Sequence, residues 1–285
     1  MILTQFALLL IIILAPSRRE CKDFLKSQPF ALLKNLVVGD IIIIRKRSDT
    51  FGCSKFYGKD FKAVLKNKKL SILGDSISTY KGVSDDISAN SSLLYNPFFY
   101  RLPFPSEKTY WKRLIDDLEM TLCVNNSWSG GNLSGRDNPS SGINRATNLA
   151  RDDGTKPDII LVFMGLNDLG RGVAPELFSA DYEKTLITIK ENYPGATVCC
   201  VNLPDRDIFL KKRAEIFNAE IEKAVKSAGE NFFIADLFKS RLNNDFYYMN
   251  TVDGIHPDED GMKIIAEIIE RALLDNCKKT LCQTL

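Results

Sequence analysis

A histidine and a carboxylate near the end of this sequence could form a general base. His256 is the only histidine of the 285 residues, and Asp253 stands three residues before it in Asp-Gly-Ile-His-Pro. An imidazole titrates near neutral pH, so it can take a proton from a nucleophile and return it to a leaving group. A single histidine is more often structural than catalytic, so this interpretation depends on finding a nucleophile for it.

The matching nucleophile is Ser76, in the segment Leu-Gly-Asp-Ser-Ile-Ser that spans residues 73–78. This segment directly follows an apolar run that predicts the first strand. Ligands of open parallel sheets bind in the loops at the carboxyl ends of strands, where Ser76 would lie. For Gly-Asp-Ser taken alone, the alternative is a turn in which Ser76 caps the next helix.

Two further loops after predicted strands carry groups that could stabilise an oxyanion. One contains Gly130 within 125–131, where a glycine lets a backbone N–H approach a ligand closely. The other contains the amide of Asn167 in Gly-Leu-Asn-Asp. Ester cleavage passes through a tetrahedral anion, and losing one such donor typically lowers the rate about a hundredfold to a thousandfold. Together with Ser76 and His256, these loops supply every part of an acyl-transfer site.

The elements that must position these residues follow from an alternation of β-rich and helical segments after residue 68. Such an alternation predicts a parallel sheet with helices on both faces. We expect strands at 69–74, 121–126, 158–164, 197–203 and 232–237, and helices at 107–119, 175–192, 207–229 and 258–274. The last helix should have Pro257 at its first position and the acids at 258–260 at the positive end of its dipole. The predicted fold class is α/β, a three-layer α/β/α sandwich with a five-stranded, mainly parallel, flavodoxin-like sheet.

The four segments, in this order and each at a strand end, resemble the SGNH hydrolase superfamily, also called GDSL hydrolases. The resemblance covers about residues 68–275. The matching blocks are GDSIS at Ser76, the glycine at Gly130, GLND at Asn167, and DGIHP at Asp253 and His256. Four ordered blocks are far more specific than any single one.

The resemblance implies a role for each matching residue. Ser76 would be the nucleophile of a catalytic triad with His256 as base and Asp253 as its orienting acid. The oxyanion hole would combine the backbone N–H groups of Ser76 and Gly130 with the side chain of Asn167. Because two glycines are adjacent in the second block, Gly131 is a competing assignment for Gly130. Two neighbouring acids are expected to organise their loops, namely Asp75 and Asp168.

The implied activity is hydrolysis of a carboxylic ester through an acyl-enzyme, with no metal and no organic cofactor. Similar proteins include lipases, thioesterases, arylesterases and carbohydrate deacetylases, and the resemblance favours an O-acetyl group on a carbohydrate over a long lipid chain. One alternative is an acyltransferase that uses the same residues, and another is a non-catalytic carbohydrate-binding module. The sequence has no G-x-S-x-G elbow, which argues against an ordinary α/β-hydrolase.

Composition narrows the classes of partner and cofactor. Lys+Arg number 38 against 36 Asp+Glu, a net charge of +2, and no long basic run could follow a nucleic-acid backbone. The seven cysteines lack the spacing of a metal site. We interpret Cys123, Cys199 and Cys200 as core residues, and leave open a disulfide between Cys277 and Cys282.

The chain divides into three predicted parts. Residues 1–20 form a hydrophobic segment that resembles a signal peptide or anchor, 21–67 an extension of unclear role, and 68–285 the hydrolase domain. The apolar run at 2–15 is shorter than the roughly 20 residues of a spanning helix. It favours secretion or N-terminal anchoring over a cytoplasmic location, and membrane association only through this run.

Two features lie close to the predicted site. An aromatic-rich insertion at about 80–105 would either line or cover the substrate pocket, or only pack its own loop down. The glycosylation sequons at Asn125 and Asn132 bracket Gly130. Because glycans there would obstruct the oxyanion hole, we expect both asparagines to be unmodified.

Overall fold

A parallel sheet forms the centre of the computed structural model, which describes residues 61–80, 83, 105–204, 211–239 and 250–283. All described residues belong to one compact unit that runs from Gly52 to Leu285. The strand order is β2-β1-β3-β4-β5, and every neighbouring pair is parallel. The described strands are β1 Lys69–Gly74, β2 Thr121–Ser127, β3 Ile159–Phe163, β4 Thr197–Val201 and β5 Phe232–Ala235. This order is flavodoxin-like, as predicted.

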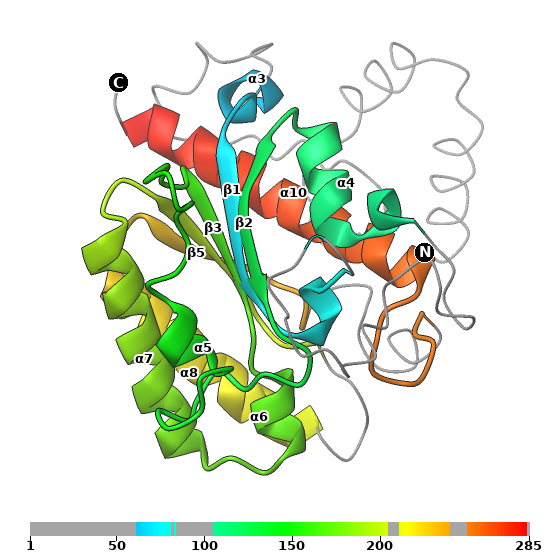
Figure 1. Cartoon of the computed structure of the whole chain (residues 1–285), viewed down its shortest axis with the longest axis vertical. Coiled ribbons are helices and arrows are strands. Elements are labelled where there is room, and N and C mark those ends of the chain that lie inside the picture. The colour runs from blue at the N-terminus through cyan, green and yellow to red at the C-terminus, as the bar shows by residue number, and fades with distance from the viewer. Residues whose placement is uncertain (1–60, 81–82, 84–104, 205–210, 240–249, 284–285) are drawn as a thin grey trace, which may run out of the picture. The chain divides into compact units, whose positions relative to one another are not determined.

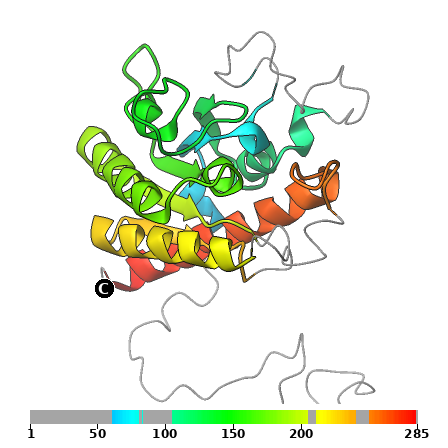
Figure 2. The same ribbon diagram turned by 90° about the horizontal axis from the view of Figure 1, so that it is seen from below.

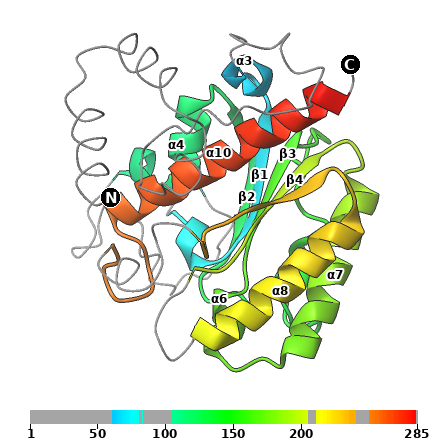
Figure 3. The ribbon, with the colours of Figure 1, turned by 180° about the vertical axis from the view of Figure 1, so that it is seen from behind.

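Helices cover both faces of the sheet, which confirms the predicted three layers (Figure 1). One face carries α4 (Tyr110–Asp117) and α10 (Glu259–Gln283), and the other carries α5 (Gly142–Arg145), α7 (Pro175–Asn192) and α8 (Lys211–Ala228). Figure 2 shows α7 and α8 side by side, and Figure 3 shows α10 across the sheet from both. The shorter described elements are α3 (Lys62–Leu65), η3 (Ser76–Ser78), η4 (Ser106–Lys108) and α6 (Leu166–Gly170).

The central strands are buried along nearly their whole length. All five residues of β3 are buried, and so are all residues of β1 after Lys69. Strands covered on both faces read as continuous apolar runs rather than alternating ones, which is why these segments were recognisable in the sequence. On α4, the buried face includes Trp111 and Leu114, and the Thr109 hydroxyl caps the helix by accepting the Lys112 N–H.

The last helix departs from the prediction at both ends. It begins at Glu259 rather than 258, and Asp258 Oδ1 accepts the Gly261 N–H at 2.8 Å, as an N-cap residue does. Placing Pro257 at the first helical position was therefore wrong, because this proline precedes the cap. The helix also continues past Leu274 to Gln283, since Cys277 packs against the core and extends the apolar face.

Several other boundaries also differ from the expected ones. The predicted helix at 107–119 is split by Thr109 into η4 and α4, and three strands end earlier than expected, at Phe163, Val201 and Ala235. Each of these strands is followed directly by a loop at the carboxyl end of the sheet. The last residues that were predicted for each of these three strands therefore belong to the loops, which carry polar groups.

The described cysteines agree with a role in packing. Cys123, Cys199 and Cys200 are buried, as predicted, and Cys277 is a free thiol. No helix in the described ranges is long and apolar enough to cross a membrane. The apolar run at 2–15 and nearly all of the aromatic-rich insertion lie outside the described residues.

Candidate active site

Ser76 lies in a tight turn at the carboxyl end of β1. Asp75 Oδ1 accepts the Ile77 N–H at 3.0 Å, so Asp75 caps this turn and the alternative in which Ser76 is the cap is wrong. Gly74 permits the turn, because a Cβ there would lie 2.6 Å from both Ser127 Oγ and Ser78 Cβ. The Ser76 side chain therefore stays available at the edge of the sheet.

The loop before α10 brings His256 to this turn. The Asp258 N–H donates to the Asn250 carbonyl at 2.9 Å, and the Val252 N–H donates to the His256 carbonyl at 3.0 Å. Glu259 at the start of the helix pairs with Lys108 at 2.8 Å. Backbone hydrogen bonds close the loop, and this ion pair fixes the helix that follows it.

Ser76, His256 and Asp253 form a continuous hydrogen-bonded series. His256 Nε2 lies 2.9 Å from Ser76 Oγ, and Nδ1 lies 2.8 Å from Asp253 Oδ2. The other Asp253 oxygen accepts the N–H groups of His256 and Ile255 at 2.8 and 3.0 Å. Partial burial pushes the pKa of Asp253 up, but these hydrogen bonds and the imidazole outweigh it and lower the pKa. An ionised Asp253 can only accept, so Nδ1 carries the proton and Nε2 can accept the proton of Ser76.

The loop after β2 presents Gly130 beside this series. Gly130 has φ +70°, a left-handed conformation that suits glycine. The Gly131 N–H closes a turn by donating to the Trp128 carbonyl at 3.0 Å. Within the described part of the chain, neither the Ser76 N–H nor the Gly130 N–H has a hydrogen-bond acceptor. This difference favours Gly130 over Gly131 as the donor available to a ligand.

Asn167 joins this loop to the turn that carries Ser76. It lies in α6, which begins after Gly165 (φ +125°), two residues past the end of β3. Its Nδ2 donates to the Gly131 carbonyl at 3.0 Å and to Asp75 Oδ2 at 3.3 Å. The structure therefore brings together the loops of Ser76, Gly130 and Asn167, as the sequence predicted for strand ends in one parallel sheet.

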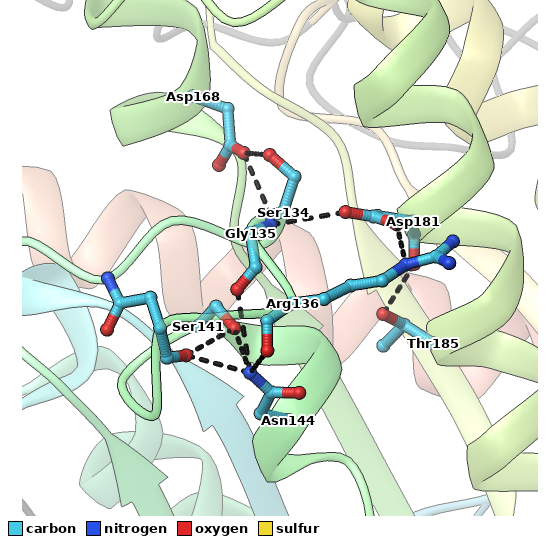
Figure 4. Close-up of polar contacts among 9 residues, drawn as sticks. Ser134, Gly135, Arg136, Ser141, Asn144, Asp168, Asp181 and Thr185 are labelled. Atoms are coloured by element: carbon cyan, nitrogen blue, oxygen red, sulfur yellow. Dashed lines mark hydrogen bonds and ion pairs between the residues drawn. The ribbon is translucent and has the colours of Figure 1, made fainter.

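Two buried carboxylates accept hydrogen bonds from the rest of the loop after β2 (Figure 4). Asp168 accepts the N–H groups of Leu133 and Ser134 at 2.7 and 3.0 Å, and also the Ser134 hydroxyl. Asp181 on α7 accepts the Gly135 N–H at 3.1 Å. Burial raises the pKa of Asp168, although the hydrogen bonds from Ser134 and Leu133 act in the opposite direction. Asp168 therefore organises its neighbouring loop, as expected from the sequence.

Arg171 also holds this loop, and the sequence analysis did not identify it. Its Nη1 donates to the Gly130 carbonyl at 2.7 Å and to Asn132 Oδ1 at 2.6 Å. Arg171 follows Asn167 by four residues, so both lie on the same side of one helical turn. That spacing is a signal in the sequence, but it becomes informative only once α6 is known to exist.

A second residue that the sequence did not reveal is Arg145, which is only 3% exposed. It donates to the Gly74 carbonyl at 3.0 Å, to the Ser140 carbonyl at 2.9 Å and to Asn126 Oδ1 at 3.1 Å. These contacts join the ends of β1 and β2 behind the turn that carries Ser76. Burial raises the pKa of Asp75 to about 7, while the Ile77 N–H and the charge of Arg145 act to lower it.

The two sequons are built into the same loops. Asn125 is 2% exposed, and its side chain donates to the Ser78 carbonyl at 3.0 Å and accepts from Ser127 Oγ at 2.6 Å. Asn132 accepts from Arg171. Glycosylation of Asn125 in the folded protein would require both of its side-chain hydrogen bonds to break.

Comparisons with known proteins agree with this arrangement. The profile of the GDSL-like Lipase/Acylhydrolase family matches residues 72–264. An arylesterase from Vibrio mimicus is 24% identical over 208 residues, covering 73% of this chain and 89% of that protein. A solved structure from Bacteroides ovatus, described as a GDSL-like lipase, has a TM-score of 0.55 and 23% identity and covers 72% of this chain and 97% of that one.

A second similar solved structure is a family 2 carbohydrate esterase with a carbohydrate-binding domain, from Myceliophthora fergusii. It has a TM-score of 0.52 and 18% identity and covers 73% of this chain and 66% of that one. At these identities the solved structures show a shared fold, whereas the family profile spans more than half of the chain. The chain belongs to the GDSL-like lipase/acylhydrolase family and is a serine hydrolase that acts on ester bonds.

Proposed function

We propose that the protein hydrolyses a carboxylic ester by way of an acyl-enzyme on Ser76, with His256 as general base and Asp253 as its orienting acid. The observation that carries this proposal is the 2.9 Å hydrogen bond between His256 Nε2 and Ser76 Oγ, continued at 2.8 Å to Asp253. A nucleophile bonded to a base that a third group orients is the arrangement that covalent catalysis needs.

In the proposed acylation step, Ser76 Oγ attacks the ester carbonyl while its proton passes to His256 Nε2. The carbonyl oxygen becomes an anion, which the N–H groups of Ser76 and Gly130 and the Asn167 amide would stabilise. His256 then gives its proton to the departing alcohol as the carbon–oxygen bond breaks.

In the proposed deacylation step, water replaces the alcohol. A proton of this water passes to His256 Nε2 while the water oxygen attacks the acyl carbon. Collapse of the second tetrahedral anion releases the carboxylic acid, and His256 returns the proton to Ser76 Oγ. The protein ends in its starting state.

The proposed substrate is a short acyl ester, with an O-acetyl group on a carbohydrate as the specific candidate. The support is the resemblance of the four sequence blocks to enzymes that include carbohydrate deacetylases, and the fold shared with a family 2 carbohydrate esterase. We expect the protein to release acetate from acetylated xylan. We also expect it to hydrolyse p-nitrophenyl palmitate far more slowly than p-nitrophenyl acetate. Faster hydrolysis of the palmitate ester would contradict this substrate.

Hydrolysis of p-nitrophenyl acetate by the full-length protein tests the role of Ser76. Ser76→Ala should lower kcat by at least about a thousandfold, because the nucleophile is lost. The matched control is Ser179→Ala, which removes a hydroxyl that bonds Glu220 between α7 and α8. The control should keep wild-type activity, and a Ser76→Ala protein as active as the control would overturn the proposal.

A further inference from the structure

The Asn167 amide donates to two oxygens, one on a carbonyl that can only accept and one on a carboxylate that can only accept while it is ionised. They are the Gly131 carbonyl, 3.0 Å from Nδ2, and the Asp75 carboxylate, 3.3 Å from Nδ2. If the amide were turned over, Oδ1 would face both of these oxygens. The two acceptors therefore determine which end of the amide points toward the nucleophile turn. An oxyanion hole needs the NH2 end there, and the N–H directed at Asp75, which makes the longer of the two contacts, is the one that an oxyanion would share.

Asp75 is the acceptor that links this orientation to the nucleophile. It is 2% exposed and directly precedes Ser76, and its Oδ1 is fixed by the Ile77 N–H at 3.0 Å. The other oxygen, Oδ2, therefore faces Asn167. Movement of the nucleophile turn would therefore also move the group that orients the amide.

The burial of Asp75 needs a functional explanation. Removing a carboxylate from water is unfavourable, and here burial raises its pKa to about 7 despite the Ile77 N–H and the positive charge of Arg145. Titratable groups perturbed in this way gather at functional sites. A neutral residue would cap the turn without this penalty, so the carboxylate must serve more than the cap.

We infer that Asp75 is a positioning residue for ester hydrolysis, which holds Asn167 so that Nδ2 rather than Oδ1 faces the oxyanion. This inference rests on the proposed function, since it requires that Asn167 stabilises the oxyanion. Asp75 touches neither the substrate nor the reacting atoms and acts only through the amide. Its effect belongs to the transition state, so it should appear in kcat rather than in KM.

Asparagine has nearly the same shape as aspartate but cannot satisfy both partners of Asp75. One oxygen of Asp75 accepts from the Ile77 N–H and the other from the Asn167 NH2 group. An asparagine offers one oxygen and one NH2 group, so one of the two partners must face a donor. Asp75→Asn therefore disturbs the orientation of Asn167 while changing the volume of the site very little.

A double-mutant cycle on the full-length protein tests the inference, using kcat and KM for p-nitrophenyl acetate. Asp75→Asn should lower kcat about tenfold to a hundredfold, less than or equal to the loss of one oxyanion donor, with KM changed less than about threefold. In an Asn167→Ala background, the same substitution should lower kcat by less than about twofold. Equal effects of Asp75→Asn in both backgrounds would show that Asp75 does not act through Asn167.

Asp158→Asn is the matched control for loss of a carboxylate. Asp158 also accepts a backbone N–H, that of Lys69 at 2.8 Å, but it directly precedes β3 and so lies at the amino ends of the parallel strands. Asp158→Asn should leave kcat unchanged. If Ser76→Ala keeps its activity, the proposed function fails; if activity depends on Ser76 but the cycle is additive, only the role of Asp75 fails.

A measurement on the native aspartate covers the case in which Asp75→Asn does not fold. In His256→Ala protein, which has no histidine, the side-chain NH2 signals of Asn167 can be followed by NMR from pH 5 to 9. Three other charged or titratable groups interact with Asp75 or sit beside it: Tyr110 from α4, Arg145 from α5 and Asp168 from α6. A titration of the Asn167 signals near pH 7 is expected, separate from that of the Leu133 and Ser134 N–H groups, which report Asp168. Constant Asn167 signals would overturn the inference.

Discussion

Asp253 determines which nitrogen of the only histidine carries a proton. One of its oxygens is occupied by the backbone N–H groups of Ile255 and His256, and the other faces His256 Nδ1 at 2.8 Å. Because the pKa of this carboxyl is lowered, the group stays ionised at neutral pH and accepts the Nδ1 proton. The Nε2 lone pair is then directed at Ser76, as a general base requires.

Asp253→Asn should therefore lower activity without displacing the loop. The asparagine oxygen can still accept the two backbone N–H groups, which leaves its NH2 group facing Nδ1. Nδ1 must then accept, and the ring proton moves to Nε2, where it blocks proton transfer from Ser76. We expect kcat for p-nitrophenyl acetate to fall by about a thousandfold or more with KM within a few-fold. A fall of less than tenfold would mean that Asp253 does not set the tautomer.

The raised pKa of Asp75 predicts a pH-dependent cost in stability. Because the pKa is about 7 in the folded protein and 3.8 in the reference state, the folded state keeps a proton that the unfolded chain releases. Stability therefore falls as pH rises from about 4 to 7. Asp75→Asn removes this titration, so its free energy of unfolding relative to wild type should increase between pH 5 and pH 8, by about 3 kcal/mol at roughly 1.4 kcal/mol per pKa unit. Urea unfolding at both pH values measures this change, and an unchanged difference would contradict it.

How far these residues could be predicted from the sequence depended on their spacing. Ser76 and Asn167 each lie in a short block at a predicted strand end, so a parallel sheet was enough to bring them together. His256 lies in a short block just before the last predicted helix. The buried Arg145 carried no such signal, because arginine is rarely buried and its partners include the carbonyl of Gly74, which is distant in the sequence. Contacts of this kind depend on the folded chain.

At the scale of elements, the start of α10 determines where His256 lies. Gly261 is in the first turn of this helix, and a Cβ there would lie against the Asn250 carbonyl oxygen and 2.9 Å from Pro257 Cβ. Those two residues close the loop that carries His256. The glycine is therefore needed for a close approach between the helix and its preceding loop.

Gly261→Ala should lower both activity and stability. Helix propensity alone predicts a gain of about 0.5–1 kcal/mol, since alanine favours a helix over glycine. We expect a loss of stability instead, because the loop must move away from the helix. This movement would also displace His256, which the loop carries. Thermal unfolding and hydrolysis of p-nitrophenyl acetate report the two effects.

Gly195→Ala is the control for this substitution, because a Cβ at Gly195 meets nothing within 4 Å. It should leave kcat at the wild-type value. A Gly261→Ala protein that is more stable than wild type and equally active would show that the loop tolerates the added methyl group.

The long elements were predictable and the short ones were not. The buried β1 and the eighteen-residue α7 match their predicted bounds, because a continuous apolar run and a long helical segment are strong signals. α5 and α6, with four and five residues, are too short to show a period. Because Arg145 ends α5 and Arg171 directly follows α6, the contacts of these two arginines were missed, whereas Asn167 and Asp168 were predicted from their block.

At the scale of the whole molecule, the parallel sheet gathers distant parts of the sequence. Ser76 and His256 are 180 residues apart and share one hydrogen bond, and Asp75 and Asn167 are 92 apart and share another. Parallel strands place all their carboxyl ends at one edge, so loops from several strands meet there. This topology explains why four separate blocks, rather than one continuous motif, identify the site.

The most direct test of the account is covalent labelling of the full-length protein with a fluorophosphonate, followed by mass spectrometry of its peptides. A serine activated by His256 should take up one phosphonyl group per chain, on the peptide that contains Ser76. Labelling should disappear in Ser76→Ala and slow by at least about a hundredfold in His256→Ala, which lacks the general base. A label on another residue, or equal labelling of wild type and Ser76→Ala, would contradict the assignment of Ser76 as nucleophile.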